Sequence, residues 1–395
     1  MRISTVWAQQ RAINDILDRQ ASMATTQQQL SSGKRILNAS DDPVAAAQVL
    51  QLQHVDAANQ QYQRNIDSAS NRLGMEQSSL DQVTSILQRV RTLALQGTNG
   101  TQTPADRTAA ATELRQLFAQ LVQVANGKDA RGDSLFAGNA ANTTPFVQGS
   151  DFGISYAGDD GQRMVAAAPG MQVATGDPGR EVFMDIPAGN GRFEVQADSA
   201  NTGSLVVGSN SVTDNSAYTG GDYTVTFTAP DQWQAEDASG TVVATGSYTG
   251  QGAVAFAGMQ IQLDGTAATG DTLHVQAGTA QSVFTSIGNL IGAFENMPPG
   301  TASSNTVNRQ IEGIDQSMQR VLDVQARVGA RLDTLNQQKT SEGDLGVKYQ
   351  GAISDLQDVD MASAIGQLNL QQVALQAAQQ TYVKVQGMSL FDFLK

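Results

Sequence analysis

The side chains best suited to acid–base catalysis or metal binding are scarce in this chain. Its 395 residues include two histidines, His54 and His274, which lie far apart, and no cysteine. The histidines do not form the H-E-x-x-H spacing that binds zinc on a helix. Without cysteine there is no thiolate nucleophile, no disulfide and no cysteine-bound metal. We therefore expect no catalytic, cofactor-binding or metal-binding residues, and no enzymatic activity.

Two short motifs resemble ligand sites but fit other interpretations better. Gly33-Lys34 is similar to the end of a P-loop, yet Gln28 takes the place of the first glycine and Arg35 that of the Ser or Thr. Asp159-Asp160 is a pair of carboxylates between two glycines, and aspartates are common in such turns. Neither motif predicts a phosphate site or a catalytic carboxylate pair.

The acidic charge of the chain is concentrated in its middle. The net charge is −14, and residues 145–300 hold 16 acidic but only 3 basic side chains. Nucleic-acid binding needs a basic surface, so this distribution excludes it. No stretch approaches the roughly 18 apolar residues of a membrane span, and no apolar segment of a cleavable signal follows the first residues. We expect no membrane insertion; if the chain leaves the cell, a route that reads an uncleaved N-terminus must carry it.

The elements that would position any functional side chain are long helices near the two chain ends. A seven-residue repeat of apolar positions predicts a pairing helix over 44–96, with Asp42 as its N-cap, Pro43 in its first turn and Glu76 as a polar exception. The repeat consists of Ile66, Leu73, Leu80, Leu87 and Ala94. A second helix is predicted from Thr103-Pro104 to about Gly127.

The C-terminal part of the chain has a matching repeat, formed by Ile314, Val321, Val328 and Leu335. It predicts a helix over 304–341, a break at Gly343 and Gly346, and a last helix from about Asp360. The first 40 residues also have a loose helical pattern. The end helices are rich in Gln and poor in large apolar residues, so we hypothesise that they fold fully only when paired with each other and with neighbouring subunits. An ordinary intramolecular coiled coil is the alternative.

The middle of the chain changes to a period of two, as in Tyr223-Thr224-Val225-Thr226-Phe227, with turn residues between such runs. The predicted fold is therefore α+β: a long antiparallel helical coiled-coil bundle from both chain ends, with an inserted antiparallel β domain. The expected division is an N-terminal assembly helix over 1–42, the N-terminal part of the helical core over 43–144, the acidic β domain over 145–300, the C-terminal part of the core over 301–344 and a C-terminal assembly helix over 345–395.

Several motifs near the two ends resemble the bacterial flagellin family. They are Leu30-Ser31-Ser32-Gly33-Lys34-Arg35-Ile36, the run from Ala39 to Ala47, Leu87-Gln88-Arg89-Val90-Arg91 with Leu93-Ala94, Asn99-Gly100-Thr101 and Asp358-Val359-Asp360-Met361-Ala362. The resemblance covers about 1–140 and 300–395, well over half of the chain.

Other segments resemble the members of this family that form the hook–filament junction next to the filament. They are Arg2-Ile3-Ser4-Thr5, the run from Gly132 to Gly138 with Pro145-Phe146, Tyr156-Ala157-Gly158-Asp159 and the run from Gln386 to Leu394. The same pattern explains Gly132 of the adhesion tripeptide Arg131-Gly132-Asp133 as part of a bend. A hook-associated motif over Gly265 to Leu273 has Ala267 where Pro is usual. A filament flagellin remains the alternative, although filament subunits usually end in Leu-Leu-Arg.

The resemblance implies a structural subunit that is exported unfolded through the flagellar type III channel and is located outside the cell, at the hook–filament junction. It implies self-assembly through terminal coiled coils into a layer on which flagellin polymerises. The implied partners are other copies of the chain, the first hook-associated junction protein, flagellin and a flagellar export chaperone.

The resemblance also implies residues for contacts between subunits. They are Leu30, Gly33, Arg35, Asp41, Asp42, Pro43, Leu87, Gln88, Arg89, Leu93, Asp358, Asp360, Leu368, Leu375, Leu390 and Phe393. In the alternative interpretation, Leu87 and Leu93 belong to the seam of a long helix while Gln88 and Arg89 are ordinary exposed polar groups. Recognition of this segment by an innate immune receptor is a further, weaker implication.

Overall fold

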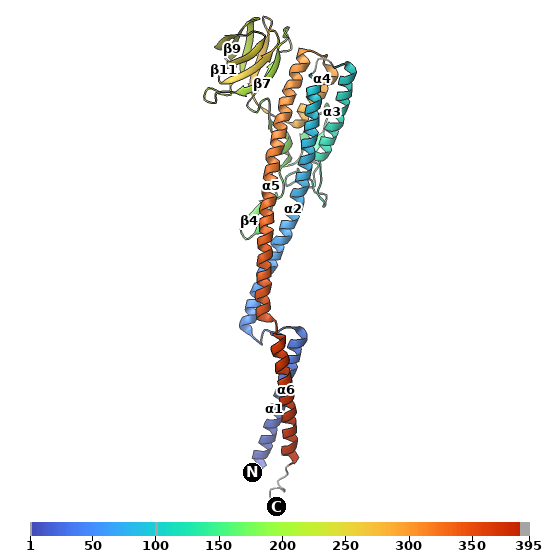
Figure 1. The fold of residues 1–395 in the computed structure, drawn as a ribbon, viewed down its shortest axis with the longest axis vertical. Coiled ribbons are helices and arrows are strands. Elements are labelled where there is room, and N and C mark those ends of the chain that lie inside the picture. Colours follow the sequence, from blue (N-terminus) through green and yellow to red (C-terminus); the bar gives the residue numbers. More distant parts are fainter. Residues whose placement is uncertain (1, 99–101, 388–395) are drawn as a thin grey trace, which may run out of the picture. The chain divides into compact units, whose positions relative to one another are not determined.

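The computed structural model describes residues 2–98 and 102–387 and divides into two compact units (Figure 1). The terminal unit comprises Met1–Arg64 and Lys339–Lys395, and the central unit comprises Asn65–Gln338. Within the described residues the α-helices are α1 (Arg2–Ser32), α2 (Pro43–Gly97), α3 (Pro104–Ala125), α4 (Val283–Asn296), α5 (Thr301–Gln357) and α6 (Met361–Gly387). Helices α2 and α5 each contribute residues to both units.

Local signals determine where α1, α2 and α3 begin or end. Gly33 adopts φ +70°, a left-handed conformation that ends α1 and that glycine adopts without strain. Asp42 accepts a hydrogen bond from the N–H of Ala45 at the start of α2. Thr103 and Asp106 form a complete capping box at the start of α3. The predicted helices over 44–96 and from Thr103-Pro104 to about Gly127 are thereby confirmed.

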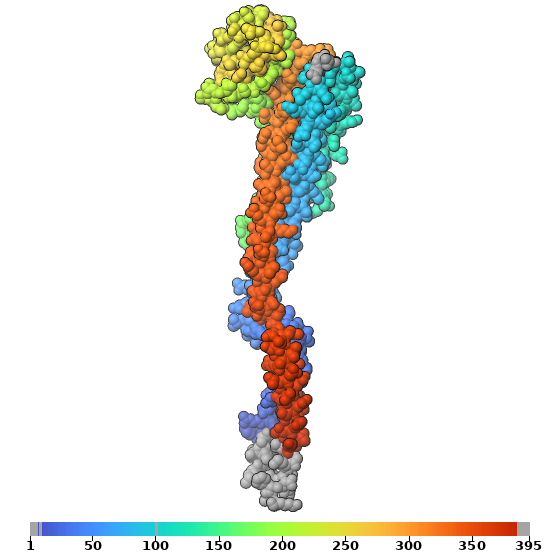
Figure 2. Space-filling view, viewed as in Figure 1, coloured from blue at the N-terminus to red at the C-terminus, as the bar shows by residue number. Residues whose placement is uncertain are grey.

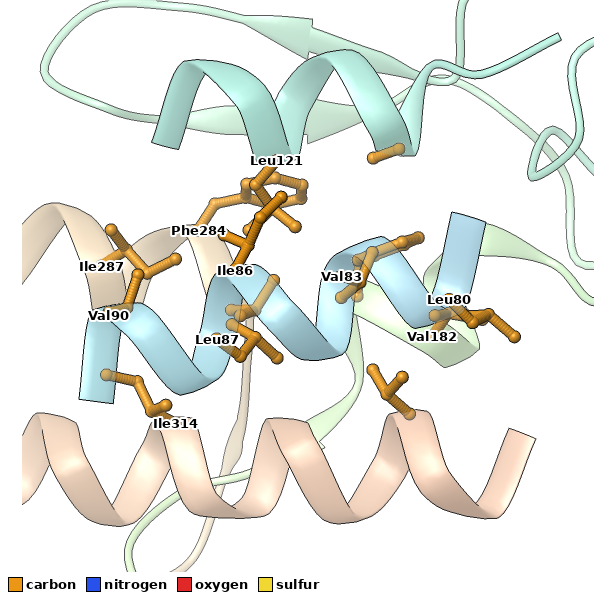
Figure 3. Close-up of a cluster of buried hydrophobic side chains, with 14 of the residues drawn as sticks. Leu80, Val83, Ile86, Leu87, Val90, Leu121, Val182, Phe284, Ile287 and Ile314 are labelled. Carbon is orange, nitrogen blue, oxygen red and sulfur yellow. The ribbon is translucent and has the colours of Figure 1, made fainter. Parts of the chain in front are cut away.

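The seven-residue repeats form the apolar core of the central unit. All nine repeat positions, from Ile66 to Ala94 on α2 and from Ile314 to Leu335 on α5, are at most 1% exposed. The two helices are antiparallel, since Arg91 pairs with Asp315 and Gln325 bonds to Asp81. Figure 3 shows α2 between α5 and α3, with Leu87 and Ile314 on one side and Ile86 and Leu121 on the other.

The break predicted at Gly343 and Gly346 is wrong, because α5 continues without interruption to Gln357. Each glycine costs a helix about 1 kcal/mol relative to alanine. Contacts with α2 offset that cost: Asn59 donates to the carbonyl oxygen of Glu342 at 2.9 Å, and Gln63 donates to the same oxygen at 3.0 Å. A Cβ at position 346 would lie 3.3 Å from Oδ1 of Asn59, so Gly346 permits the close approach of the two helices.

The segment 145–300 contains two kinds of structure. Its first strands and α4 pack on the helical core of the central unit, whereas residues 193–277 enclose a separate apolar core of their own. We call residues 193–277 the insert; in Figure 2 it is the yellow-green lobe beside α5. The strands outside the insert are β1 (Phe146–Gln148), β2 (Ile154–Tyr156), β3 (Met164–Ala168), β4 (Met171–Ala174), β5 (Ile186–Pro187) and β14 (Ala280–Gln281), and a π-helical turn, η1, spans Arg180–Met184.

The insert consists of two antiparallel sheets with the order β10-β9-β8-β13-β6 and β11-β12-β7. Its strands are β6 (Phe193–Ala197), β7 (Val206–Val212), β8 (Tyr223–Ala229), β9 (Gln232–Asp237), β10 (Val242–Ser247), β11 (Gln251–Phe256), β12 (Met259–Asp264) and β13 (Thr272–Ala277). The period-two pattern is confirmed, since Val225 and Phe227 point into the core from β8. Helix α4 was missed within the expected β region, although Ser282 is a good N-cap and Phe284, Ile287 and Ile291 have helical spacing.

A buried charged network interrupts the apolar seam at Glu76. Oε1 of Glu76 accepts a hydrogen bond from the N–H of Asp177, and Arg331 on α5 binds the Asp177 carboxylate through two nitrogens at 2.8 and 3.0 Å. Arg72, one turn before Glu76, pairs with Asp129 at 2.6 Å. Loss of solvation on burial, and then the Asp177 carboxylate, raise the pKa of Glu76 to about 8. This network fastens the loop around Asp177 to both long helices.

The raised pKa of Glu76 predicts a pH-dependent stability. Between its ordinary pKa near 4.5 and about 8, the folded chain binds a proton that the unfolded chain releases, so the free energy of unfolding falls as the pH rises through this window. Glu76→Gln keeps the acceptor for Asp177 and removes the titration. We expect its pH slope in urea unfolding at pH 5.5, 7 and 8.5 to be shallower by up to about 1.4 kcal/mol per pH unit. Equal slopes in the two proteins would contradict this assignment.

Backbone conformation predicts opposite effects for alanine at two glycines of the terminal unit. Gly33→Ala should lower the free energy of unfolding by about 1 kcal/mol, because an L-residue at φ +70° is strained. Gly343→Ala should raise it by about 0.5–1 kcal/mol, because alanine favours a helix interior. A Cβ would meet no atom within 4 Å at either site, so the pair isolates backbone conformation. Urea unfolding followed by circular dichroism tests this, and shifts of the same sign would refute it.

Candidate assembly interface

The joint between the end helices brings together many of the residues predicted for contacts between subunits. We define the joint as residues 33–42, which connect α1 to α2, and 357–360, which connect α5 to α6. The N–H of Arg35 donates to the carbonyl of Gln357 at 2.7 Å, and the N–H of Val359 donates to that of Gly33 at 3.0 Å. The Arg35 guanidinium also donates to the carbonyl of Leu356 at 2.7 Å. The two connections therefore hold each other within one chain.

Aspartates complete this joint from each side. Oδ2 of Asp41 accepts hydrogen bonds from the N–H groups of Leu37 and Asn38, which closes the loop. Asp42 precedes Pro43, the first residue of α2, and the hydrogen bond from the N–H of Ala45 lowers the pKa of its carboxyl. Both residues thus organise the start of the long helix.

The C-terminal connection uses its aspartates in the same way. Asp358 accepts a hydrogen bond from the hydroxyl of Ser354 at 2.5 Å and forms a β-bridge with Lys34. Asp360 caps α6, and hydrogen bonds from the hydroxyl and N–H of Ser363 lower the pKa of its carboxyl. These predicted residues have roles within the chain, and their contacts with other subunits stay a prediction.

Helices α1 and α6 lie side by side with a thin common core (Figure 1). Among the side chains described on these two helices, the buried ones are Thr26, Ala364 and Leu375. Leu30 and Leu368, two further predicted contact residues, are half-buried between them. Such a pair buries much less apolar surface than α2 with α5, so its own packing stabilises it weakly.

Large apolar side chains point away from this thin core into solvent. Trp7 and Leu17 on α1 are 64% and 54% exposed, and Leu370, Val373 and Val383 on α6 are 65–73% exposed. A hollow of about 350 Å³ lies beside Leu370 between the two helices. The contact residues implied by the resemblance did not include these five. The signal that was available on α6 is that Leu370, Val373 and Val383 are apolar as well as Leu368 and Leu375.

The segment from Leu87 to Leu93 divides into buried and exposed positions. Leu87 and Leu93 are 0% and 3% exposed and belong to the core of the central unit, whereas Gln88 and Arg89 are exposed. Arg89 binds both carboxylate oxygens of Glu113 on α3, at 2.6 and 2.9 Å, and this arginine lowers the pKa of Glu113. Only the exposed pair is placed to contact another subunit in the folded chain. Leu390 and Phe393 lie outside the described residues.

The two histidines lie in separate elements, and the adhesion tripeptide lies in a bend. His54 is exposed on α2, and His274 on β13 lies 3.5 Å from Asp198. Gly132 adopts φ +88°, and Asp133 pairs with Arg163 at 3.0 Å, which fits the bend interpretation of the adhesion tripeptide. In the described part of the chain no cluster of three His, Cys, Asp or Glu could hold a metal ion. No described helix is long and apolar enough to cross a bilayer.

Family models match the chain at both ends and in the insert. The bacterial flagellin N-terminal helical region matches residues 3–141, and the bacterial flagellin C-terminal helical region matches residues 311–394. The D2-like domain of flagellar hook-associated protein 1 matches residues 196–277, nearly the whole insert. The two helical matches include every segment that carried the predicted contact residues.

Individual relatives extend over nearly the full length. The chain is 27% identical to flagellar hook-associated protein 3 of Salmonella typhimurium over 392 residues, 99% of each chain. Its fold is similar to the crystal structure of FlgL from Xanthomonas campestris, with 30% identity and a TM-score of 0.71 over 77% of this chain and 99% of that one. The flagellar junction protein FlgL from Legionella pneumophila gives 27% identity and a TM-score of 0.72 over 79% and 100%. The chain therefore belongs to the bacterial flagellin family.

Proposed function

We propose that this protein is a structural subunit that forms a layer between hook and filament in the bacterial flagellum and serves as the adaptor on which flagellin polymerises. The observation that carries the proposal is the terminal unit, whose helices have a thin core and an apolar outer surface. Exposed apolar surface of this kind marks a site of association with other protein. The near full-length similarity to a hook-associated protein 3 supports the place of that association in the flagellum.

The proposed assembly works by coupling the order of the terminal helices to contact between copies. Each exposed Leu or Val that becomes buried against a neighbour contributes about 1.5–3 kcal/mol. Leu370, Val373 and Val383 on α6, together with Trp7 and Leu17 on α1, would supply this surface. The joint, with Arg35 bound to the backbone of α5, would hold the helix pair at a defined place in the chain. Leu30, Leu368 and Leu375 would then pack within a subunit rather than between subunits.

The remaining parts of the proposal concern partners and route. One face of the layer would contact the first hook-associated junction protein and the other would contact flagellin, while an export chaperone would cover the C-terminal helix beforehand. The chain would leave the cell unfolded through the flagellar export channel.

The division at 42, 144, 300 and 344 remains our functional division of the chain, with the end segments as assembly helices. The matches of both helical ends to the bacterial flagellin helical regions leave the filament role as the second candidate.

The similarity of residues 196–277 to a domain of flagellar hook-associated protein 1 favours the junction over the filament. A strain that lacks this protein distinguishes the two roles. For a junction subunit, hooks should still form while flagellin is shed unassembled into the medium, as seen by electron microscopy and by blotting the supernatant. Attached filaments of normal length in that strain would overturn the junction role. Long filaments grown from the purified protein alone would support the filament role instead.

The terminal surface predicts an assembly defect without a folding defect. Leu370→Asp combined with Val373→Asp places two charges on exposed positions, so the free energy of unfolding of the monomer should change by about 0.5 kcal/mol or less. Incorporation into the junction should be lost, because each buried apolar contact of about 2 kcal/mol corresponds to roughly 30-fold in affinity. Complementation of the deletion strain measures this in swimming and in attached filaments.

Gln379→Asp is the matched control, since Gln379 is an exposed polar residue of the same helix. It introduces one charge without removing apolar surface, and it should complement like the unchanged protein. Full complementation by the double variant would contradict the assembly role of this surface.

A further inference from the structure

The insert is attached to α5 by side chains that replace a neighbouring strand. β7 is the edge strand of its sheet, so one row of its backbone groups has no strand to bond. Asn305 on α5 accepts from the N–H of Val207 at 2.7 Å and donates to the carbonyl of Leu205 at 2.9 Å. Asn308 donates to the carbonyl of Val207 at 2.9 Å. The two side-chain amides thus form hydrogen bonds that a neighbouring strand would otherwise form with this edge.

Two charged residues continue the same stripe of α5. Arg309 pairs with Glu194 on β6 at 3.1 Å, and Oε1 of Glu312 accepts a hydrogen bond from the side-chain amide of Asn210 on β7 at 2.9 Å. Residues 305, 308, 309 and 312 have the spacing of one helix face. We call these four side chains and their bonds to the insert the clasp. It is polar throughout, unlike the seam between α2 and α5.

The packing around the clasp is incomplete. A hollow of about 430 Å³ lies on the Asn305 and Arg309 side, and another of about 400 Å³ lies beside Asn210 and Glu312. Nδ2 of Asn190 and Oδ1 of Asn210, which border the second hollow, are buried without a hydrogen-bond partner among the described residues. Each such atom costs about 1–3 kcal/mol when it is held away from water. These unpartnered atoms therefore oppose docking of the insert, whereas the hydrogen bonds of the clasp favour it.

The chain passes between the insert and the helical core at two points, and both contain glycine. The entering connection, between β5 and β6, contains Gly189 and Gly191, which adopt φ +61° and +86°, and the leaving connection, between β13 and β14, contains Gly278. The insert also has its own apolar core, which excludes the helices. A body with a separate core and glycines at both connections can rotate without unfolding.

We propose that the insert is a hinged body that the clasp on α5 holds in one orientation, and that ionisation of the Glu312 carboxyl releases it. The geometry supports release at this residue in particular, because Glu312 lies at the end of the clasp, beside the unpartnered amide oxygen of Asn210. An ionised carboxylate held there, away from water, is opposed by its lost solvation, and undocking restores that solvation.

The charges around Glu312 set the direction of the switch. Burial, and then the carboxylates of Glu194 on β6 and Asp315 on α5, raise the pKa of Glu312 to about 7, while the Asn210 hydrogen bond lowers it. Each of those two carboxylates is paired with an arginine, Glu194 with Arg309 and Asp315 with Arg91. Between pH 4.5, the ordinary pKa of a glutamate, and about pH 7, docking of the insert is therefore accompanied by uptake of a proton by Glu312. Docking weakens as the pH rises through this window.

Distance measurements between spin labels test the proposal directly. The chain has no cysteine, so Val243→Cys on β10 and Leu322→Cys on α5, both exposed, give a single pair of labels. At pH 5.5 we expect one narrow distance distribution. At pH 8.5 the docking constant should be on the order of 30-fold lower, and a second, broad population should appear.

Variants separate the clasp from other effects of pH. Glu312→Gln keeps the acceptor for Asn210 and should give the narrow distribution at both pH values. The double variant Asn305→Ala with Asn308→Ala should give the broad distribution at both pH values. Gln319→Ala is the control, because the Gln319 amide bonds Asp323 on the same helix, and it should behave like the unchanged protein. A distribution that is the same at pH 5.5 and 8.5, or a pH shift that persists in Glu312→Gln, would overturn the proposal.

Discussion

The antiparallel seam between α2 and α5 is the constraint on which the other parts of this structure depend. Its apolar side chains recur every seven residues and are almost completely buried, and Arg91 with Asp315 fixes the relative position of the helices. Helices α3 and α4 pack on this pair (Figure 3). The loop around Asp177 is hydrogen-bonded to both helices of the pair. The charged network at Glu76 is costly in a seam, but a single polar position can specify the register of paired helices.

The same two helices support parts with very different stabilisation. In the central unit, aromatic contacts such as Phe146 with Phe183 and Phe284 add to the aliphatic seam. In the terminal unit, α1 and α6 are rich in Ala, Gln and Ser, and several of their large apolar side chains face solvent. Stability that is missing within the chain can be supplied by association, since a partner that binds the ordered form stabilises it. The distribution of core within the molecule thus agrees with a function in assembly.

Sequence patterns predicted those features that short-range chemistry decides. Asp42 and Thr103 marked helix starts correctly, and the repeats identified the buried faces of α2 and α5. The break predicted in α5 failed for a tertiary reason: α5 passes through Gly343 and Gly346 because Asn59 and Gln63 bind its backbone. The joint was invisible for the same reason, since the bond between Arg35 and Gln357 joins residues more than three hundred positions apart. The resemblance selected the segments expected to contact other subunits, which stays a prediction, and packing decides which of their side chains remain available to a partner.

The contrast between the seam and the clasp explains how α5 can bind α2 permanently and the insert reversibly. An apolar seam excludes water, and separating it would expose every repeat position at once, so it opens only when the unit unfolds. The clasp consists of a few polar groups whose hydrogen bonds water can replace when the insert undocks. The acidic charge of the middle segment adds to this difference, because Glu194, Glu312 and Asp315 repel one another whenever all three are ionised. The polar stripe on α5 therefore makes the attachment of the insert responsive to solution conditions, while the seam leaves the helical framework unchanged.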